Sequence, residues 1–148
     1  MLKNQKRLTG IAQPKAGKAK KKQSISTLKK KLWKEFSLFI RNRDKWTCYT
    51  CGRKAEGSGL HAGHFISKSV GGISLYFHEK NVSAQCYNCN INLSGNIWIY
   101  GQKLGEKTVA ELYAIKGQTA KWTVDDYLEK IAYYKGINDL STRKFESD

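Results

Sequence analysis

Four cysteines, arranged as two Cys-x-x-Cys pairs, carry the clearest metal-binding signal in this sequence. Cys48 and Cys51 form the first pair, Cys86 and Cys89 form the second, and together they are all the cysteines of the chain. Two such pairs can present four thiolates tetrahedrally to Zn²⁺, and a site with four Cys ligands has no position open for water. Two disulfides or four unrelated thiols are the alternatives. The paired spacing favours a zinc ion with a structural role.

A second group of residues has the chemistry needed for hydrolysis. His64 lies between the two cysteine pairs, and Asn90 directly follows the last cysteine. An imidazole can take a proton from water, and an amide oxygen is a hard ligand that suits Mg²⁺. Such a pair could hydrolyse a phosphodiester. Taken singly, a histidine on a strand is more often a packed or surface residue, and an asparagine after a cysteine pair is often a helix cap.

The 34 residues that separate Cys51 from Cys86 must bring these groups together. We predict a β-hairpin there, with strands at 60–67 and 73–78 and with the glycines of KSVGG in the turn. A short helix is expected to begin within or just after the segment CYNCNINLSGN. This arrangement would place His64 at the end of the first strand, facing Asn90 across one pocket.

Helices are predicted on both sides of this region. A helix from near Thr27 to about Asp44 is indicated by one apolar stripe, with Trp33 beside it; the stripe consists of Leu28, Leu32, Phe36, Phe39 and Ile40. Further along, Thr108 to Glu111 has the pattern of a capping box, and Gly117 is a plausible helix stop. Thr123 and Asp126 form a second, weaker box that opens a C-terminal helix.

The charge of the chain indicates a polyanionic partner. The formal net charge is +15 over 148 residues, and residues 1–31 contain eleven Lys or Arg and no Asp or Glu. We predict that residues 1–26 are a flexible, disordered basic arm that contacts nucleic acid, partly through Lys20, Lys21 and Lys22. A merely solvated tail is the alternative. No stretch is long and apolar enough for a membrane span, and no secretion signal is visible, so we expect a cytoplasmic protein with reduced cysteines.

The segment GHF…EKNVSAQCYNCN resembles the HNH endonucleases, also called His-Me finger or ββα-metal nucleases. A closer resemblance is to the NinG/Rap family of phage recombination endonucleases. It rests on FIRNRDKWTCYTCG, AGHFISKS, NVSAQCYNCN, SGN with the Tyr100 that follows, and the LG at residues 104–105. The resemblance covers roughly residues 36–105, with weaker helical similarity beyond.

The resemblance implies an α+β fold in which residues 27–148 form a zinc-stapled ββα-metal core with flanking α-helices. His64 matches the general base, Asn81 the central asparagine that braces the loop, and Asn90 the ligand of a catalytic Mg²⁺ or Mn²⁺. The four cysteines match the structural zinc knuckles. Branched or recombination-intermediate DNA in the bacterial host cytoplasm is the implied substrate, and symmetrical cutting of a four-way junction would be compatible with a homodimer.

The sequence departs from these families beside the predicted base. Gly63 stands where many HNH enzymes have an acidic residue, and His61 stands where NinG-like sequences commonly have Asp. Imidazole is a softer ligand, so His61 would favour Mn²⁺, Ni²⁺ or Zn²⁺ over Mg²⁺. Lys68 is a candidate for holding the scissile phosphate. Arg41 and Arg43 are candidates for DNA binding, or for favourable electrostatics at a helix C-terminus.

Two other classes of function fit parts of the sequence. A non-catalytic zinc-knuckle module that binds DNA or RNA would keep the cysteines, the arm and the charge, and would give His64 and Asn90 structural roles. A basic structural or ribosome-associated RNA protein would explain the composition but would make the spacing of the histidine and asparagines coincidental. We therefore expect a metal-dependent DNA endonuclease.

Overall fold

The computed structural model describes residues 23–145, and the side chains of residues 23–142. The predicted arm, including Lys20, Lys21 and Lys22, lies almost entirely outside the described residues. The order of the elements is α1 (Ile25–Arg43), η1 (Gly57–Gly59), β1 (Leu60–His64), α2 (Lys68–Tyr76), β2 (Val82–Cys86), η2 (Asn88–Asn92), α3 (Ile97–Leu104), α4 (Glu106–Ile115) and α5 (Val124–Phe145). Helices with one small sheet make this an α+β fold, as predicted.

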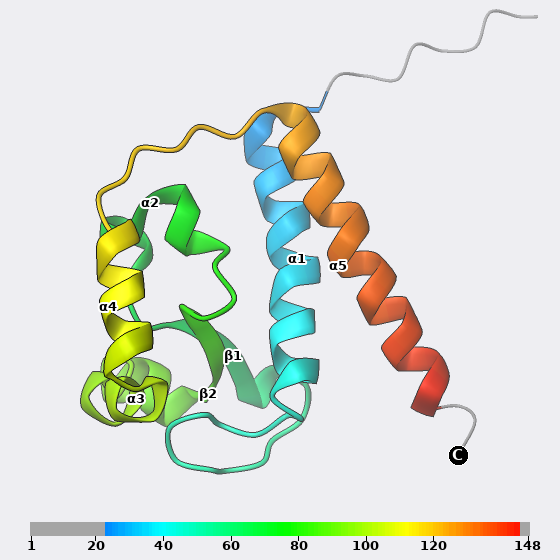
Figure 1. Cartoon of the computed structure of the whole chain (residues 1–148). Helices are drawn as coiled ribbons and strands as arrows, with labels where there is room; N and C mark the ends of the chain where they lie inside the picture. The colour runs from blue at the N-terminus through cyan, green and yellow to red at the C-terminus, as the bar shows by residue number, and fades with distance from the viewer. Residues whose placement is uncertain (1–22, 146–148) are drawn as a thin grey trace, which may run out of the picture.

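Helix α1 forms one side of the molecule. The Ser24 side chain accepts a hydrogen bond from the Thr27 backbone N–H, so α1 begins slightly before the predicted start. Its predicted stripe is confirmed, since Leu28, Leu32, Phe36 and Ile40 are fully buried. The stripe packs on the sheet and on α5, which runs alongside α1 in the same direction (Figure 1).

The two strands pair antiparallel, with His61 opposite Gln85 and His64 opposite Val82. The prediction of a hairpin was right about the first strand and wrong about the second. Residues 73–76 belong to helix α2, which is kinked at Gly72 with φ of 64°. The strand that pairs with β1 instead begins at Val82.

The second strand was missed although apolar and polar residues alternate along VSAQC. The segment is short and less apolar than residues 73–78, and burial does not follow the alternation, since the polar Ser83 and Gln85 are buried as well. The neighbouring glycines, which resemble a turn in the sequence, have a different use. A Cβ at position 71 would lie only 2.7 Å from the Cβ of Leu75, so Gly71 allows close packing inside α2.

Helices α3 and α4 lie on the side of the sheet away from α1 (Figure 1). They enclose a second cluster of buried residues that includes Phe65, Leu75, Tyr100 and Leu112. The short helix predicted near the second cysteine pair is confirmed as the single π-helical turn η2, which α3 soon follows. Among the described residues, no helix is both long and apolar enough to cross a membrane.

The helix caps near the C-terminus were predicted in part. The prediction of a capping box at Thr108 is wrong, because α4 already begins at Glu106. The Glu111 carboxylate instead pairs with the Lys80 ammonium group at 2.7 Å. The helix does end just before Gly117, which has φ of 86°. The box at Thr123 is confirmed: the Asp126 N–H donates to the Thr123 hydroxyl, and the Asp126 carboxylate accepts from the Thr123 N–H.

Candidate active site and metal centre

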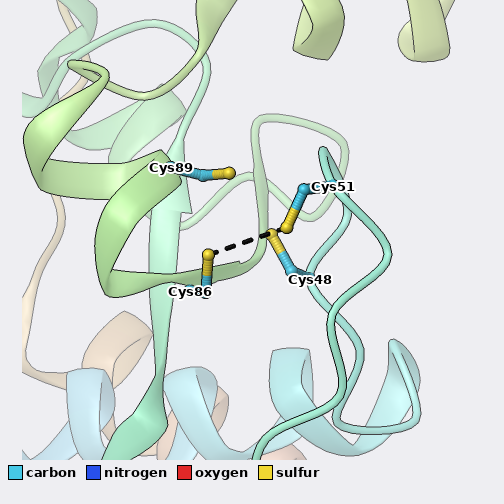
Figure 2. A group of neighbouring side chains, drawn as sticks. All are labelled: Cys48, Cys51, Cys86 and Cys89. Carbon is cyan, nitrogen blue, oxygen red and sulfur yellow. Dashed lines mark hydrogen bonds between the residues drawn. The ribbon is translucent and has the colours of Figure 1, made fainter.

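The four cysteines lie together and point toward one another (Figure 2). Their sulfurs all lie within 4.8 Å of one another, and the Cys51 and Cys86 sulfurs are 3.7 Å apart. In a tetrahedral site with Zn–S bonds of about 2.3 Å, neighbouring sulfurs lie about 3.8 Å apart. The four-cysteine cluster (Cys48, Cys51, Cys86 and Cys89) can therefore hold a metal ion of this kind.

Backbone hydrogen bonds bring the two cysteine pairs together. The Tyr49 N–H donates to the Ala84 carbonyl at 2.7 Å, which joins the loop after α1 to strand β2. Burial raises the pKa of the Cys48 thiol. Hydrogen bonds from the Thr50 hydroxyl and from the backbone N–H groups of Cys51 and Cys86 outweigh this effect and lower the pKa to about 6. At Cys51 a hydrogen bond from the Arg53 backbone N–H lowers the pKa, but burial and the neighbouring thiols outweigh it and raise the pKa to about 12. The thiolate is the form that binds metal, so the surroundings favour that form at Cys48 and disfavour it at Cys51.

His64 ends β1 on the face of the sheet that meets α1. Its Nε2 lies 2.9 Å from the Tyr76 carbonyl oxygen. A carbonyl can only accept, so Nε2 carries the proton and donates it, which leaves the lone pair on Nδ1. The ring stacks on Trp33, with centroids 5.4 Å apart and planes 13° apart. These two contacts fix both the tautomer and the orientation of the imidazole.

The surroundings of His64 keep its ring neutral. Burial is the main cause that lowers its pKa from 6.5 to about 4; the hydrogen bond to the Tyr76 carbonyl opposes this, and the positive charge of Lys68 adds to the lowering. At neutral pH the Nδ1 lone pair is therefore available to accept a proton. Trp33 was not singled out as a site residue from the sequence, because only the packing of α1 against β1 shows that its ring meets His64.

Asn81 braces the segment that supplies the carbonyl partner of His64. This fully buried side chain accepts a hydrogen bond from the Ile66 N–H at 2.8 Å and donates to the carbonyls of Ile66 and Leu75 at 3.0 and 2.9 Å. Leu75 directly precedes Tyr76, so the amide of Asn81 ties both ends of the segment between His64 and β2. The bracing position that the resemblance implied for Asn81 agrees with this geometry.

We expect Asn81→Ala to lower the free energy of unfolding by about 2–4 kcal/mol, because it removes three buried hydrogen bonds between the side chain and the backbone. Urea unfolding followed by circular dichroism measures the effect. The matched control is Asn92→Ala, an exposed asparagine of η2, for which we expect a change below about 0.5 kcal/mol. Equal stabilities of the two variants would contradict the bracing role.

His61 and Asn90 form a close pair beside the sheet. The Nδ1 atom of His61 lies 3.0 Å from Nδ2 of Asn90. Gly63 leaves room for this arrangement, because a Cβ there would lie 2.9 Å from the Asn90 Oδ1 and would collide with the Gln85 side chain. The acidic residue that many HNH enzymes carry at this position would require the Gln85 and Asn90 side chains to move. The fully buried Gln85 is a site residue that the sequence did not indicate.

A surface pocket of about 570 Å³ adjoins the His61–Asn90 pair. We call it the basic pocket, since its charged lining side chains are Arg41 and Lys68 and it contains no Asp or Glu. His64 does not line this pocket, but its ring stacks on Trp33, which does line it. The structure thus brings Lys68, His61 and Asn90 to one pocket and places His64 against Trp33 in its wall. The prediction that His64 faces Asn90 across one pocket is not confirmed, because His64 does not line the pocket that contains Asn90.

The two arginines at the end of α1 have different surroundings. Arg43 donates to the Asp44 carboxylate at 2.7 Å and to the carbonyls of Glu79 and Val82 at 2.7 and 2.9 Å. Its guanidinium joins α1 to β2, which gives it a structural role; its role in DNA binding stays a prediction. Arg41 reaches the basic pocket, as a DNA-binding role requires.

Comparisons with known proteins agree on one family. The family model described as bacteriophage lambda NinG protein matches residues 2–143. The chain is 29% identical over 115 residues to protein ninG of Escherichia phage lambda, which covers 74% of this chain and 55% of the relative. Protein ninG of Salmonella phage P22 is 30% identical over 114 residues, with the same coverage. The chain therefore spans about half the length of these relatives. No solved structure matches it.

Proposed function

The chain belongs to the bacteriophage lambda NinG family, and from this premise we propose that it is a metal-dependent DNA endonuclease of the HNH, or His-Me finger, type. The observation that carries the proposal is the environment of His64. A neutral imidazole with its donor nitrogen held by the Tyr76 carbonyl has one free acceptor nitrogen. General-base catalysis on water needs an unprotonated acceptor nitrogen; a base is most effective when its pKa is near the working pH, and the pKa of about 4 lies below that optimum.

The His61–Asn90 pair has the spacing of two ligands on one ion. In the structure the Asn90 Nδ2 lies at hydrogen-bond distance, 3.0 Å, from the His61 Nδ1, and neighbouring ligands about 2.1 Å from an octahedral ion would be a similar distance of about 3.0 Å apart. A half-turn of the Asn90 amide exchanges its Nδ2 for its Oδ1, which then faces the imidazole nitrogen. Because one ligand is an imidazole, Mn²⁺ suits the pair better than Mg²⁺.

Each group of the site has a distinct role in the proposed hydrolysis. His64 accepts a proton from the attacking water at Nδ1. Asn90 and His61 hold the divalent ion, which when bound neutralises charge on the phosphate and on the leaving oxygen. Lys68 lies at the pocket in position to bind a phosphate oxygen. We assign Zn²⁺ to the four-cysteine cluster, where it fixes Asn90 one residue beyond a ligand.

Branched or recombination-intermediate DNA is the proposed substrate class, on the strength of the resemblance to NinG/Rap endonucleases, and a homodimer would supply two active sites. The net charge of +15 favours a polyanionic substrate. The alternative is a zinc-knuckle protein that binds DNA or RNA without cutting it.

We expect cleavage in Mn²⁺ or Mg²⁺ and none in EDTA when the chain is incubated with supercoiled, linear, nicked, flap and four-way junction DNA. Asn90→Ala should reduce the cleavage rate at least about 10-fold, because one of two protein ligands is lost. Asn92→Ala, in the same helical turn, is the control and should cut at the wild-type rate. Binding of these DNAs without cleavage in any metal would favour the non-catalytic alternative.

A further inference from the structure

Arg41 is a partly buried cation without a charged partner. Among the described residues its guanidinium makes no hydrogen bond or ion pair, and its Nε is buried without a partner. Its one close contact of note is with the Trp46 ring, whose centroid lies 5.5 Å from the guanidinium carbon. Burial also lowers the pKa of Arg41. Burying a donor nitrogen without a partner is unfavourable, and an anion beside the guanidinium would supply that partner.

The neighbouring arginine shows that the fold can pair such a group fully. Arg43, two residues further along α1, donates hydrogen bonds from its guanidinium to one carboxylate and two backbone carbonyls. Residues two apart on a helix point in different directions. Arg43 consequently faces β2 and Glu79, whereas Arg41 faces the basic pocket. The difference places the missing partner of Arg41 in that pocket.

The lining of the basic pocket selects the chemistry of this partner. Its charged side chains, Arg41 from α1 and Lys68 from α2, are both cations. Ser37 and Ser58 add hydroxyl donors, and no carboxylate in the lining opposes an anion. The His61–Asn90 pair lines the same pocket. An anion with several acceptor oxygens would satisfy the guanidinium, the ammonium group and the two hydroxyls.

We propose that Arg41 binds a phosphate group of the DNA backbone in the basic pocket, beside the His61–Asn90 pair. Arginine suits this task because its planar guanidinium can donate two parallel hydrogen bonds to one phosphate. The identification of the anion as DNA phosphate rests on the proposed function. The anion site itself rests on the unpaired guanidinium and on the acid-free lining.

The test measures DNA binding without cleavage. Fluorescence anisotropy of a labelled four-way junction in EDTA, at several NaCl concentrations, gives both the affinity and its salt dependence. Arg41→Gln should weaken binding about 10-fold or more and should reduce the slope of log affinity against log salt by about 0.9, as expected for one lost phosphate contact. The control is Arg53→Gln, which removes an exposed arginine outside the pocket; we expect less than about a 2-fold change.

Two further variants separate phosphate binding from a structural role. Arg41→Met, which keeps the apolar stem, should unfold at the wild-type temperature or above, because it removes an unpaired charge. Arg41→Lys should weaken binding with little change in the salt slope, because it keeps the charge and loses the paired donors. If Arg41→Gln and Arg41→Lys bind like the wild type, or if Arg53→Gln binds as weakly as Arg41→Gln, the proposal is overturned.

The binding measurement on the Arg41 variants tests the phosphate site whether or not the protein cuts DNA. Weakened binding of Arg41→Gln together with an inactive wild-type chain would support the phosphate site and reject the nuclease. Metal-dependent cleavage by the wild type together with unchanged binding by Arg41→Gln would reject the phosphate site alone.

Discussion

Replacing His64 with alanine is expected to reduce DNA cleavage about 10²- to 10⁴-fold, the usual contribution of a general base. The variant should keep its fold and its four-cysteine cluster, since the ring of His64 packs on Trp33 at the edge of the core and lies on a different part of the sheet from the cysteines. Rates on a DNA that the wild type cuts, measured at saturating metal, give the effect.

Two variants control for positioning effects. His64→Gln can still donate to the Tyr76 carbonyl but has no basic nitrogen, and we expect it to be as inactive as the alanine variant. His78→Ala removes a histidine whose Nδ1 accepts from the Lys80 N–H, outside the basic pocket, and should cut at the wild-type rate. Wild-type cleavage by His64→Ala would falsify the assignment of the base.

The lowered pKa of His64 gives this prediction a characteristic pH dependence. Because the pKa is about 4, the ring stays neutral as the pH falls from 7 to 5, and cleavage should not fall until the pH approaches 4. An ordinary histidine would lose activity below about pH 6.5. As the pH falls from 6.5 to 4, the His64 side chain is protonated in the unfolded chain but stays neutral in the folded protein. Stability should therefore decrease from pH 6.5 toward 4, by up to about 3 kcal/mol, and should do so less in His64→Ala.

The sequence predicts those parts of the fold whose burial is one-sided. The stripe on α1 has a polar opposite face, so its period is visible, and four of its five residues (Leu28, Leu32, Phe36 and Ile40) are fully buried. Strand β2 is buried along its whole length, and its residues are Val, Ser, Ala, Gln and Cys. Apolar and polar residues alternate along it, but the segment is short and only weakly apolar, so the second strand was assigned to the more apolar residues 73–78 instead.

The candidate site also has one part that the sequence predicts and another that it does not. Cysteine spacing predicts the four-cysteine cluster, because four sulfurs near one point need only two tight turns to be brought close. The closeness of His61 and Asn90 depends on the register that puts His61 opposite Gln85, and no local pattern states that register. The separate roles of Arg41 and Arg43 also depend on which face of α1 meets the sheet. Strand register and helix orientation are set by tertiary packing, and short-range sequence patterns do not predict them.

Removal of zinc is expected to have the largest effect on the structure. The four-cysteine cluster joins the loop after α1 to the end of β2 and to η2, and the core around it is small; besides three of the cysteines it has only Leu60 and Ala84 as buried members. Structural zinc sites contribute about 10 kcal/mol or more of apparent folding free energy, which exceeds the stability of many small domains. Chelation should therefore unfold the region from Cys48 to Asn92.

The packing of α1 against α5 does not pass through the cluster, so the loss should be local at first. The buried residues shared by these helices belong to a separate cluster. Hydrogen exchange should show lost protection in β1 and β2 after chelation, while α1 and α5 keep part of theirs. Native mass spectrometry should find one zinc per chain before chelation.

Cys89→Ser tests the same link by mutation. It should lose zinc and cleavage together, although His64 and Asn90 are unchanged, because Asn90 is then no longer next to a fixed ligand. Asn88→Ser, an exposed change within the same Cys-x-x-Cys pair, should keep both. If the zinc-free chain cuts DNA as fast as the zinc-bound chain, then the pairing of β1 with β2 alone must hold His61 beside Asn90, and the cysteines have some other purpose.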